Sequence, residues 1–113
     1  MKTLNELTLL YGTLTVGRIS NSFCTDAIWY GDFEPTIKPA DGELPKRLLD
    51  FIAFCKDWNE RARNASGADA AEFDLYDDVI KSGLWATEAP VGERQRILDA
   101  PVFFHNGELS WRV

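Results

Sequence analysis

The stretch LPKRLLDFIAFCKDWNERAR (residues 44–63) decides the fold, because it is the strongest periodic pattern in the chain. Its apolar residues recur at spacings of three and four, as they do along one side of an α-helix. They are Leu44, Leu48, Phe51, Ile52, Cys55 and Trp58. Pro45 suits a first helical turn, where its missing N–H costs nothing. The stretch therefore predicts an amphipathic helix from about Pro45 to Arg63.

Two segments before this helix alternate polar and apolar residues, which is typical of half-buried strands. Residues 7–19 carry Thr on one face, and residues 23–34 resume the alternation after the turn signal Ser20-Asn-Ser22. In the second segment, Trp29 and Phe33 share one face while Tyr30 lies on the other. The two segments together predict a β-hairpin.

After the helix, a second helix is predicted over Ala70 to Ser82, with Asp69 as its cap and Glu72 three residues further on. Residues 84–88 form a short strand candidate, and residues 93–98 fit either one helical turn or another strand. Each of these segments is short, so the pattern alone leaves the last alternative open.

The pair Asn106-Gly107 is the clearest turn signal in the chain, because a two-residue type I′ turn requires positive φ at both positions. Such a turn fixes the strand register. It pairs His105 with Glu108, Phe104 with Leu109, Phe103 with Ser110 and Val102 with Trp111. The predicted core face is then Val102, Phe104, Leu109 and Trp111. The opposite face carries Phe103, His105, Glu108, Ser110 and Arg112.

These elements predict a single globular domain over residues 1–113 with an α+β fold. We expect a mostly antiparallel sheet of four to five strands, with two helices packed on one face.

Net charge excludes several classes of partner. The chain carries a net charge of −6, and its pI is about 4.7. Phosphate binding needs clustered Lys and Arg, so neither nucleic acid nor an anionic membrane is an expected partner. Neither a signal peptide nor a membrane-spanning apolar run is visible in the sequence, so a cytoplasmic location is expected.

The acidic excess lies in residues 65–113, which hold nine acidic and four basic residues. Five of the acids fall between Asp69 and Asp78. We interpret this run as the first turns and solvated face of the second predicted helix, with an acidic docking patch as the alternative. The two cysteines, Cys24 and Cys55, belong to no metal or redox motif and are expected to be buried reduced thiols.

Two groups of residues are candidates for a binding site. The first lies in WYGDFEP (29–35), where Trp29, Tyr30, Asp32 and Glu34 could form a ligand rim. Aromatic residues at strand spacing are also typical of a core, so the segment has a purely structural interpretation.

The second candidate group comprises His105, Glu108 and Arg112 on one face of the C-terminal hairpin. With Glu108 directly across, His105 could be oriented as a general base, or the two could form an exposed ion pair beside the turn. The sequence contains no nucleophile motif, metal-ligand spacing or phosphate-binding loop, so neither a metal nor a cofactor is expected. This favours a role other than catalysis.

The segment W-Y-G-D-F-E-P, followed by the Leu/Phe-rich helix, Gly-Leu-Trp85 and a closing aromatic strand, resembles small uncharacterised bacterial proteins with a W-x-G-x-F-x-P core. The resemblance implies a bacterial origin and no particular activity or site residue.

Three functional hypotheses follow. The first is a protein-binding or adaptor module, of which an immunity protein that neutralises a basic toxin is one form. The second is a small-molecule binder or enzyme that uses Trp29–Glu34 or the His105/Glu108 face. The third is self-association as a homodimer, because the last strand is expected to form a sheet edge.

Overall fold

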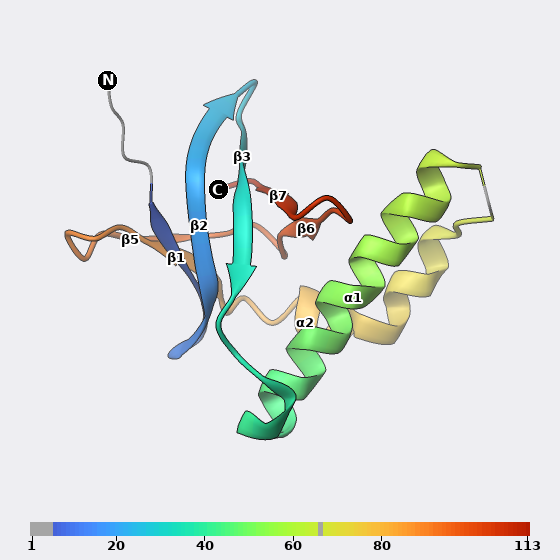
Figure 1. The fold of residues 1–113 in the computed structure, drawn as a ribbon, viewed down its shortest axis with the longest axis horizontal. Helices are drawn as coiled ribbons and strands as arrows, with labels where there is room; N and C mark the ends of the chain where they lie inside the picture. The colour runs from blue at the N-terminus through green and yellow to red at the C-terminus, as the bar shows by residue number, and fades with distance from the viewer. Residues whose placement is uncertain (1–5, 66) are drawn as a thin grey trace.

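The computed structural model describes residues 6–65 and 67–113 (Figure 1). Within these residues, seven strands form one antiparallel sheet in the order β5-β4-β1-β2-β3-β7-β6. The elements are β1 (Leu7–Tyr11), β2 (Leu14–Thr25), β3 (Ile28–Pro35), the 3-10 helix η1 (Pro39–Asp41), α1 (Glu43–Arg63), the 3-10 helix η2 (Ala70–Tyr76), α2 (Asp77–Ile80), β4 (Trp85–Glu88), β5 (Arg94–Arg96), β6 (Val102–Phe103) and β7 (Glu108–Trp111). The α+β class is confirmed, but the predicted number of strands, four to five, is wrong.

The strand count is higher because residues 7–19 form a hairpin and not one strand. Tyr11 pairs with Leu14 across a two-residue turn, and Gly12 begins that turn at φ 63°. Glycine is the preferred residue for a positive φ at this turn position. The residues 93–98, left open between helix and strand, contribute β5.

The predicted turn at Ser20-Asn-Ser22 is also wrong, because β2 continues through it. Asn21 does adopt φ 54°, but it does so at a bulge where the β2–β3 register shifts. The real turn is Asp26-Ala27, where both residues have positive φ and Thr25 pairs with Ile28. Asn tolerates the left-handed conformation, which occurs in bulges as well as in turns. The residues that suggested a turn therefore form a bulge.

The helix predicted from about Pro45 to Arg63 is confirmed as α1. Leu48, Phe51, Ile52 and Cys55 are buried, while Leu44, in the first turn, is 43% exposed. Figure 1 shows α1 running alongside one end of the sheet, so the helix covers only part of the inner sheet face. Cys24, in contrast to the prediction of two buried thiols, is exposed near the end of β2.

The second predicted helix, Ala70 to Ser82, is instead η2 followed by the four-residue α2. Phe73, Tyr76 and Val79 recur every three residues, a spacing that a 3-10 helix places on one side. Phe73 and Tyr76 lie against Phe54, with ring centroids 5.0 Å away in both cases. The predicted cap is confirmed, because the Asp69 carboxylate accepts from the Ala71 amide and Glu72 accepts from the Asp69 amide.

The C-terminal hairpin has a loop one residue longer than predicted. Phe103 pairs with Leu109 and Val102 with Ser110, and the Phe104 amide donates to the carbonyl of Glu108. His105-Asn106-Gly107 is therefore a three-residue loop, in which Gly107 has φ 90°. Three-residue hairpin loops place a glycine at this left-handed position.

This shift of one residue overturns the predicted faces, because side chains alternate along a strand. Phe103, predicted on the polar face, is fully buried, whereas Val102, predicted in the core, is 40% exposed. Leu109 and Trp111 are buried as predicted. The ring of Phe103 contacts Phe33 and Phe51 at centroid distances of 5.2 and 6.2 Å, and this aromatic packing requires the observed register.

The last strand is not a sheet edge, as had been expected for a homodimer. β7 lies between β3 and β6, and the described edges are the short strands β5 and β6. Short edge strands are a common protection against pairing with other chains.

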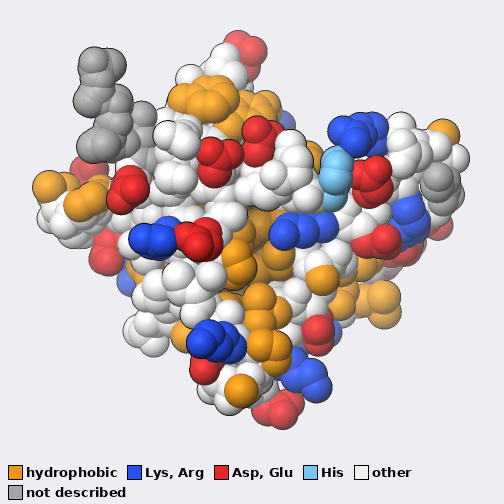
Figure 2. All heavy atoms as spheres, viewed as in Figure 1, with side chains coloured by type: hydrophobic (Ala, Val, Ile, Leu, Met, Phe, Trp, Pro, Cys, Tyr) orange, Lys and Arg blue, Asp and Glu red, His pale blue; other side chains and the backbone are white. Residues whose placement is uncertain are grey.

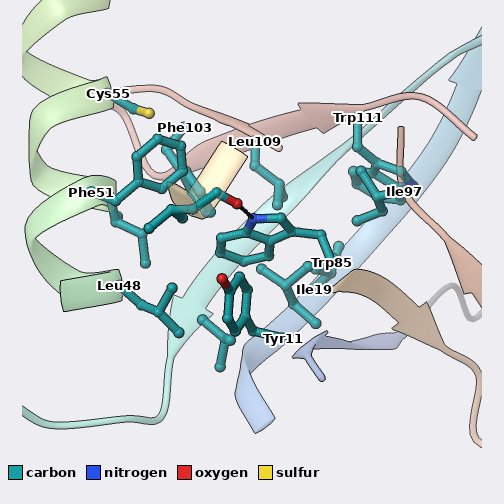
Figure 3. Packing of buried hydrophobic residues seen from close by; sticks show 14 of the residues in the cluster. Tyr11, Ile19, Leu48, Phe51, Cys55, Trp85, Ile97, Phe103, Leu109 and Trp111 are labelled. Atoms are coloured by element: carbon teal, nitrogen blue, oxygen red, sulfur yellow. Dashed lines mark hydrogen bonds between the residues drawn. The ribbon is translucent and has the colours of Figure 1, made fainter. Parts of the chain in front are cut away.

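The core lies between the inner face of the sheet, α1 and α2 (Figure 3). Trp85 is fully buried at its centre, and its indole Nε1 donates to the carbonyl of Val79 at 3.1 Å. Phe51 from α1 lies 6.1 Å from the Trp85 ring, so both helices pack on the same sheet face. No helix among the described residues is long and apolar enough to cross a membrane.

Candidate functional site

Strand β3 presents the candidate residues of the WYGDFEP segment on two different faces. Trp29 pairs with Trp111 and Gly31 with Leu109, and these residues face the core side of the sheet. Tyr30, Asp32 and Glu34 alternate with them and lie on the outer face. The predicted rim is therefore divided between the two sides.

Aromatic and acidic side chains meet on the outer face of the sheet. Phe23 stacks on Tyr30 with centroids 5.4 Å apart and an interplanar angle of 22°. Asp32 pairs with Glu108 of β7, and its carboxylate accepts from the Asn21 side chain at 2.9 Å. We call these five residues, Asn21, Phe23, Tyr30, Asp32 and Glu108, the β3–β7 surface.

The β3–β7 surface continues into a groove at the C-terminal end of α1. A hollow of about 200 Å³ lies over the surface itself, and one of about 550 Å³ lies between the hairpin loop and α1. The two share Tyr30 and Glu108, so they are contiguous. Figure 2 shows hydrophobic and acidic side chains gathered over the upper part of β2 and β3, with the single histidine between them and α1.

His105 lies in the hairpin loop and contacts α1, so its predicted pairing with Glu108 is wrong. Its Nδ1 is 2.8 Å from Oε2 of Glu60, and its Nε2 is 3.4 Å from Nη2 of Arg63. Glu108 instead bonds to Asn106 through both its backbone amide and its carboxylate. The extra loop residue removes His105 from the strand and turns it toward the helix.

The surroundings of His105 fit a structural contact better than catalysis. Both ring nitrogens already have a partner, Glu60 or Arg63, whereas a general base needs one nitrogen aimed at the substrate. Within residues 6–65 and 67–113, no group of three or more His, Cys, Asp or Glu side chains could hold a metal ion. The groove therefore offers binding groups, and its imidazole ties the hairpin loop to α1.

Three of the predicted site residues lie away from this surface. Trp29 stacks on Trp111 on the core side, with centroids 5.9 Å apart. Glu34 forms an exposed ion pair with Arg18 at 2.6 Å. Arg112 lines a separate groove together with Leu98 and Val102. The structure thus brings together Tyr30, Asp32, His105 and Glu108.

Sequence reasoning missed Phe23, Asn21 and the α1 residues Asn59, Glu60 and Arg63. No local sequence pattern indicates that Phe23 faces solvent. Its strand face depends on the bulge at Asn21, which shifts the β2–β3 register. Asn59 donates to the carbonyl of Phe103 at 3.1 Å, across 44 positions of sequence. Contacts at such separation depend on the packing of α1 against β6.

The acidic run of residues 69–78 is used within the fold. Arg61 binds both carboxylate oxygens of Glu72, at 2.6 and 2.9 Å, and this lowers the pKa of Glu72 to about 2. Asp78 bonds to Arg47 at 2.7 Å, which holds the pKa of that carboxyl below its usual range, and Asp77 pairs with Lys81. These contacts favour the structural interpretation of the run over a docking patch.

No protein-family model, curated protein or solved structure matches the chain. The comparisons therefore assign no family to the chain.

Proposed function

We propose that this chain is a protein-binding module that docks a basic segment of a partner protein on the β3–β7 surface. The observation that carries the proposal is Phe23, an aromatic side chain that is 55% exposed and stacked on Tyr30 beside two carboxylates. Exposed aromatics surrounded by polar groups are the usual anchors of protein interfaces.

The charges of the surface favour a basic partner. Neither Asp32 nor Glu108 forms an ion pair with a Lys or Arg among the described residues. Unpaired carboxylates next to an aromatic anchor favour Lys or Arg on the partner, and the net charge of −6 would attract such a partner over a distance. An immunity protein that covers a basic toxin is one form of this function.

The backbone of the surface is held in place before binding. Tyr30 and Asp32 lie on β3, an interior strand paired with β2 on one side and β7 on the other. Asn21 and Asn106 hold the two carboxylates by hydrogen bonds. A preorganised surface loses less conformational entropy on binding, so a small number of anchors is sufficient.

The test is an affinity pull-down from the organism that makes this protein, with the wild-type chain and surface variants as baits. Phe23→Ser removes the aromatic anchor, and Asp32→Asn with Glu108→Gln removes both charges. Matched controls are Val91→Ser, at a side chain that is 89% exposed in the β4–β5 turn, and Glu43→Gln with Asp50→Asn on α1. We expect one stoichiometric, basic partner, bound at least about tenfold more weakly by either surface variant.

The binding of the purified partner should also weaken as salt increases, because exposed charges are screened. Equal affinity of the surface variants and the control variants would contradict the proposal. So would repeated failure to recover any stoichiometric partner from the host.

A further inference from the structure

Part of the inner face of the sheet is not covered by α1. In Figure 1, α1 lies beside one end of the sheet, while β5 and the upper ends of β2 and β3 extend away from it. Figure 3 shows Trp111 at the end of the core opposite to Phe51 and Cys55. A hollow of about 340 Å³ opens there, which we call the Trp hollow. Its lining is Glu6, Leu7, Ser22, Trp29, Thr87, Ala89, Pro90, Glu93, Gln95 and Trp111.

Two stacked tryptophans form one wall of the Trp hollow. Trp29 and Trp111 are directly paired across β3 and β7, and their rings are stacked with an interplanar angle of 12°. Trp111 and Thr87 are almost fully buried, so the hollow is framed by side chains that the fold already holds in place. Concave, mostly apolar hollows of this size with a few polar groups are typical of small-molecule sites.

Among the residues that the structure describes, the charged side chains that line the Trp hollow are all acidic. Glu6 and Glu93 are its ionisable lining residues, and its other polar side chains, Ser22, Thr87 and Gln95, are neutral. Neither carboxylate forms an ion pair with a base in the part of the chain that the structure describes, and Arg18 attracts Glu6 only from beyond ion-pairing distance. An anionic ligand would be repelled here, whereas a cation would gain from both carboxylates.

We propose that the Trp hollow binds a small organic cation with an apolar body, such as a quaternary ammonium compound. Indole rings attract ammonium groups through their electron-rich faces, and the carboxylates of Glu6 and Glu93 add attraction at the rim. The apolar body fills the space between Leu7 and the Trp pair, where it leaves water. This site lies on the opposite sheet face from the β3–β7 surface and does not depend on the protein-binding proposal.

The test uses choline as the probe and its neutral isostere, 3,3-dimethyl-1-butanol, as the matched ligand. Binding is followed by the indole N–H signals of the four tryptophans in NMR spectra and by thermal stability. We expect choline to shift the signals of Trp29 and Trp111 in a saturable way, while Trp58 on α1 stays unchanged. The isostere should bind at least about fivefold more weakly, the factor expected for loss of one cation–π contact.

Variants assign the binding to the Trp hollow. Glu93→Gln should weaken choline binding about threefold to fivefold, as expected for loss of one carboxylate at an exposed rim, and Trp29→Leu should weaken it further. Glu43→Gln, which removes the same charge from α1, should leave the affinity unchanged. Because Trp29→Leu alters the packing of the core, a loss of binding in that variant could reflect misfolding. Glu93 is exposed, so Glu93→Gln tests the site without changing the core.

Three results would overturn the proposal. The first is no saturable shift up to about 20 mM choline, a concentration that would detect even very weak binding. The second is equal binding of the neutral isostere. The third is an unchanged choline affinity in Glu93→Gln, which would place the cation elsewhere.

Discussion

Two parts of the molecule combine aromatic rings with carboxylates, and they use them differently. In the η2–α2 segment, Phe73 and Tyr76 pack against α1, and Glu72 and Asp78 bond to arginines of that helix. On the β3–β7 surface, the exposed ring of Phe23 stacks on the half-buried ring of Tyr30, and the carboxylates of Asp32 and Glu108 accept from the asparagine side chains of residues 21 and 106.

The difference shows why an acidic sequence run is a poor guide to an acidic binding site. The run from Asp69 to Asp78 is the densest in the chain, yet two of its carboxylates, Glu72 and Asp78, bond to arginines of α1 and hold η2 and α2 against that helix. Asp32 and Glu108 are 76 positions apart and become neighbours only through β-pairing. A carboxylate without an ion pair in the folded chain therefore indicates a binding site better than a high density of acidic residues in the sequence does.

The largest expected contrast concerns the two aromatic clusters. Phe73→Ala should lower the free energy of unfolding by about 2 kcal/mol, because Phe73 packs on Phe54 and Trp58 at centroid distances of 5.0 and 4.9 Å. Phe23→Ala should cost only about 0.5 kcal/mol, since its ring is mostly in water. Urea unfolding of both variants measures the difference.

The same pair of variants can contradict the assigned difference between Phe23 and Phe73. If Phe23→Ala were as destabilising as Phe73→Ala, Phe23 would be a structural residue, and its exposure would not indicate a binding role. A matched control is Phe54→Leu, which keeps an apolar side chain on α1 and should cost less than Phe73→Ala.

A smaller contrast is expected between two arginines. Arg47 donates to the Leu75 carbonyl and to Asp78, and its guanidinium lies 4.5 Å from the Tyr76 ring centroid. Arg47→Met should therefore lower the free energy of unfolding by about 1 kcal/mol. Arg18→Met removes the exposed pair with Glu34 and should leave the unfolding midpoint unchanged. Equal midpoints for the two variants would show that η2 and α2 do not need their ion pairs.

The contrast between these regions could be predicted from the sequence only in part. The helix α1 was predictable because one apolar stripe at a 3.6-residue period extends over twenty residues. The cap at Asp69 was predictable for a similar reason, because its two bonding partners lie within three residues. Both are local, so neighbouring residues determine them.

The β-strand registers were not predictable, because they depend on contacts between distant residues. Asp26-Ala27 forms a turn without glycine, and Asn21 uses a turn-like conformation inside a strand. Asn106-Gly107 was correctly identified as a turn, but the burial of Phe103 against Phe51 and Trp85 selects the three-residue loop. As a result, the alternation that puts Tyr30 on the opposite face from Trp29 was predicted correctly, whereas the partner of His105 was not.

The smallest expected effect concerns the acid sensitivity of the η2–α2 segment. The bidentate bond from Arg61 lowers the pKa of Glu72 from 4.5 to about 2 in the folded chain. The stabilisation from this carboxylate is therefore complete above about pH 4.5 and is lost as the pH falls toward 2. In Glu72→Gln, the thermal midpoint should be lower at neutral pH and should fall less steeply between pH 4.5 and 2.

Arg61→Met provides the matched control for this titration, because it removes the main cause of the shift and leaves both the carboxyl group and its bond from the Asp69 amide in place. The pH slope of its thermal midpoint should lie between those of the wild type and Glu72→Gln, because the Asp69 amide still lowers the pKa of Glu72. The double variant should add little to Glu72→Gln. A wild-type slope in Glu72→Gln would mean that other carboxyls account for the acid sensitivity. In that case the η2–α2 segment would not differ from the β3–β7 surface in how strongly the fold depends on its charges.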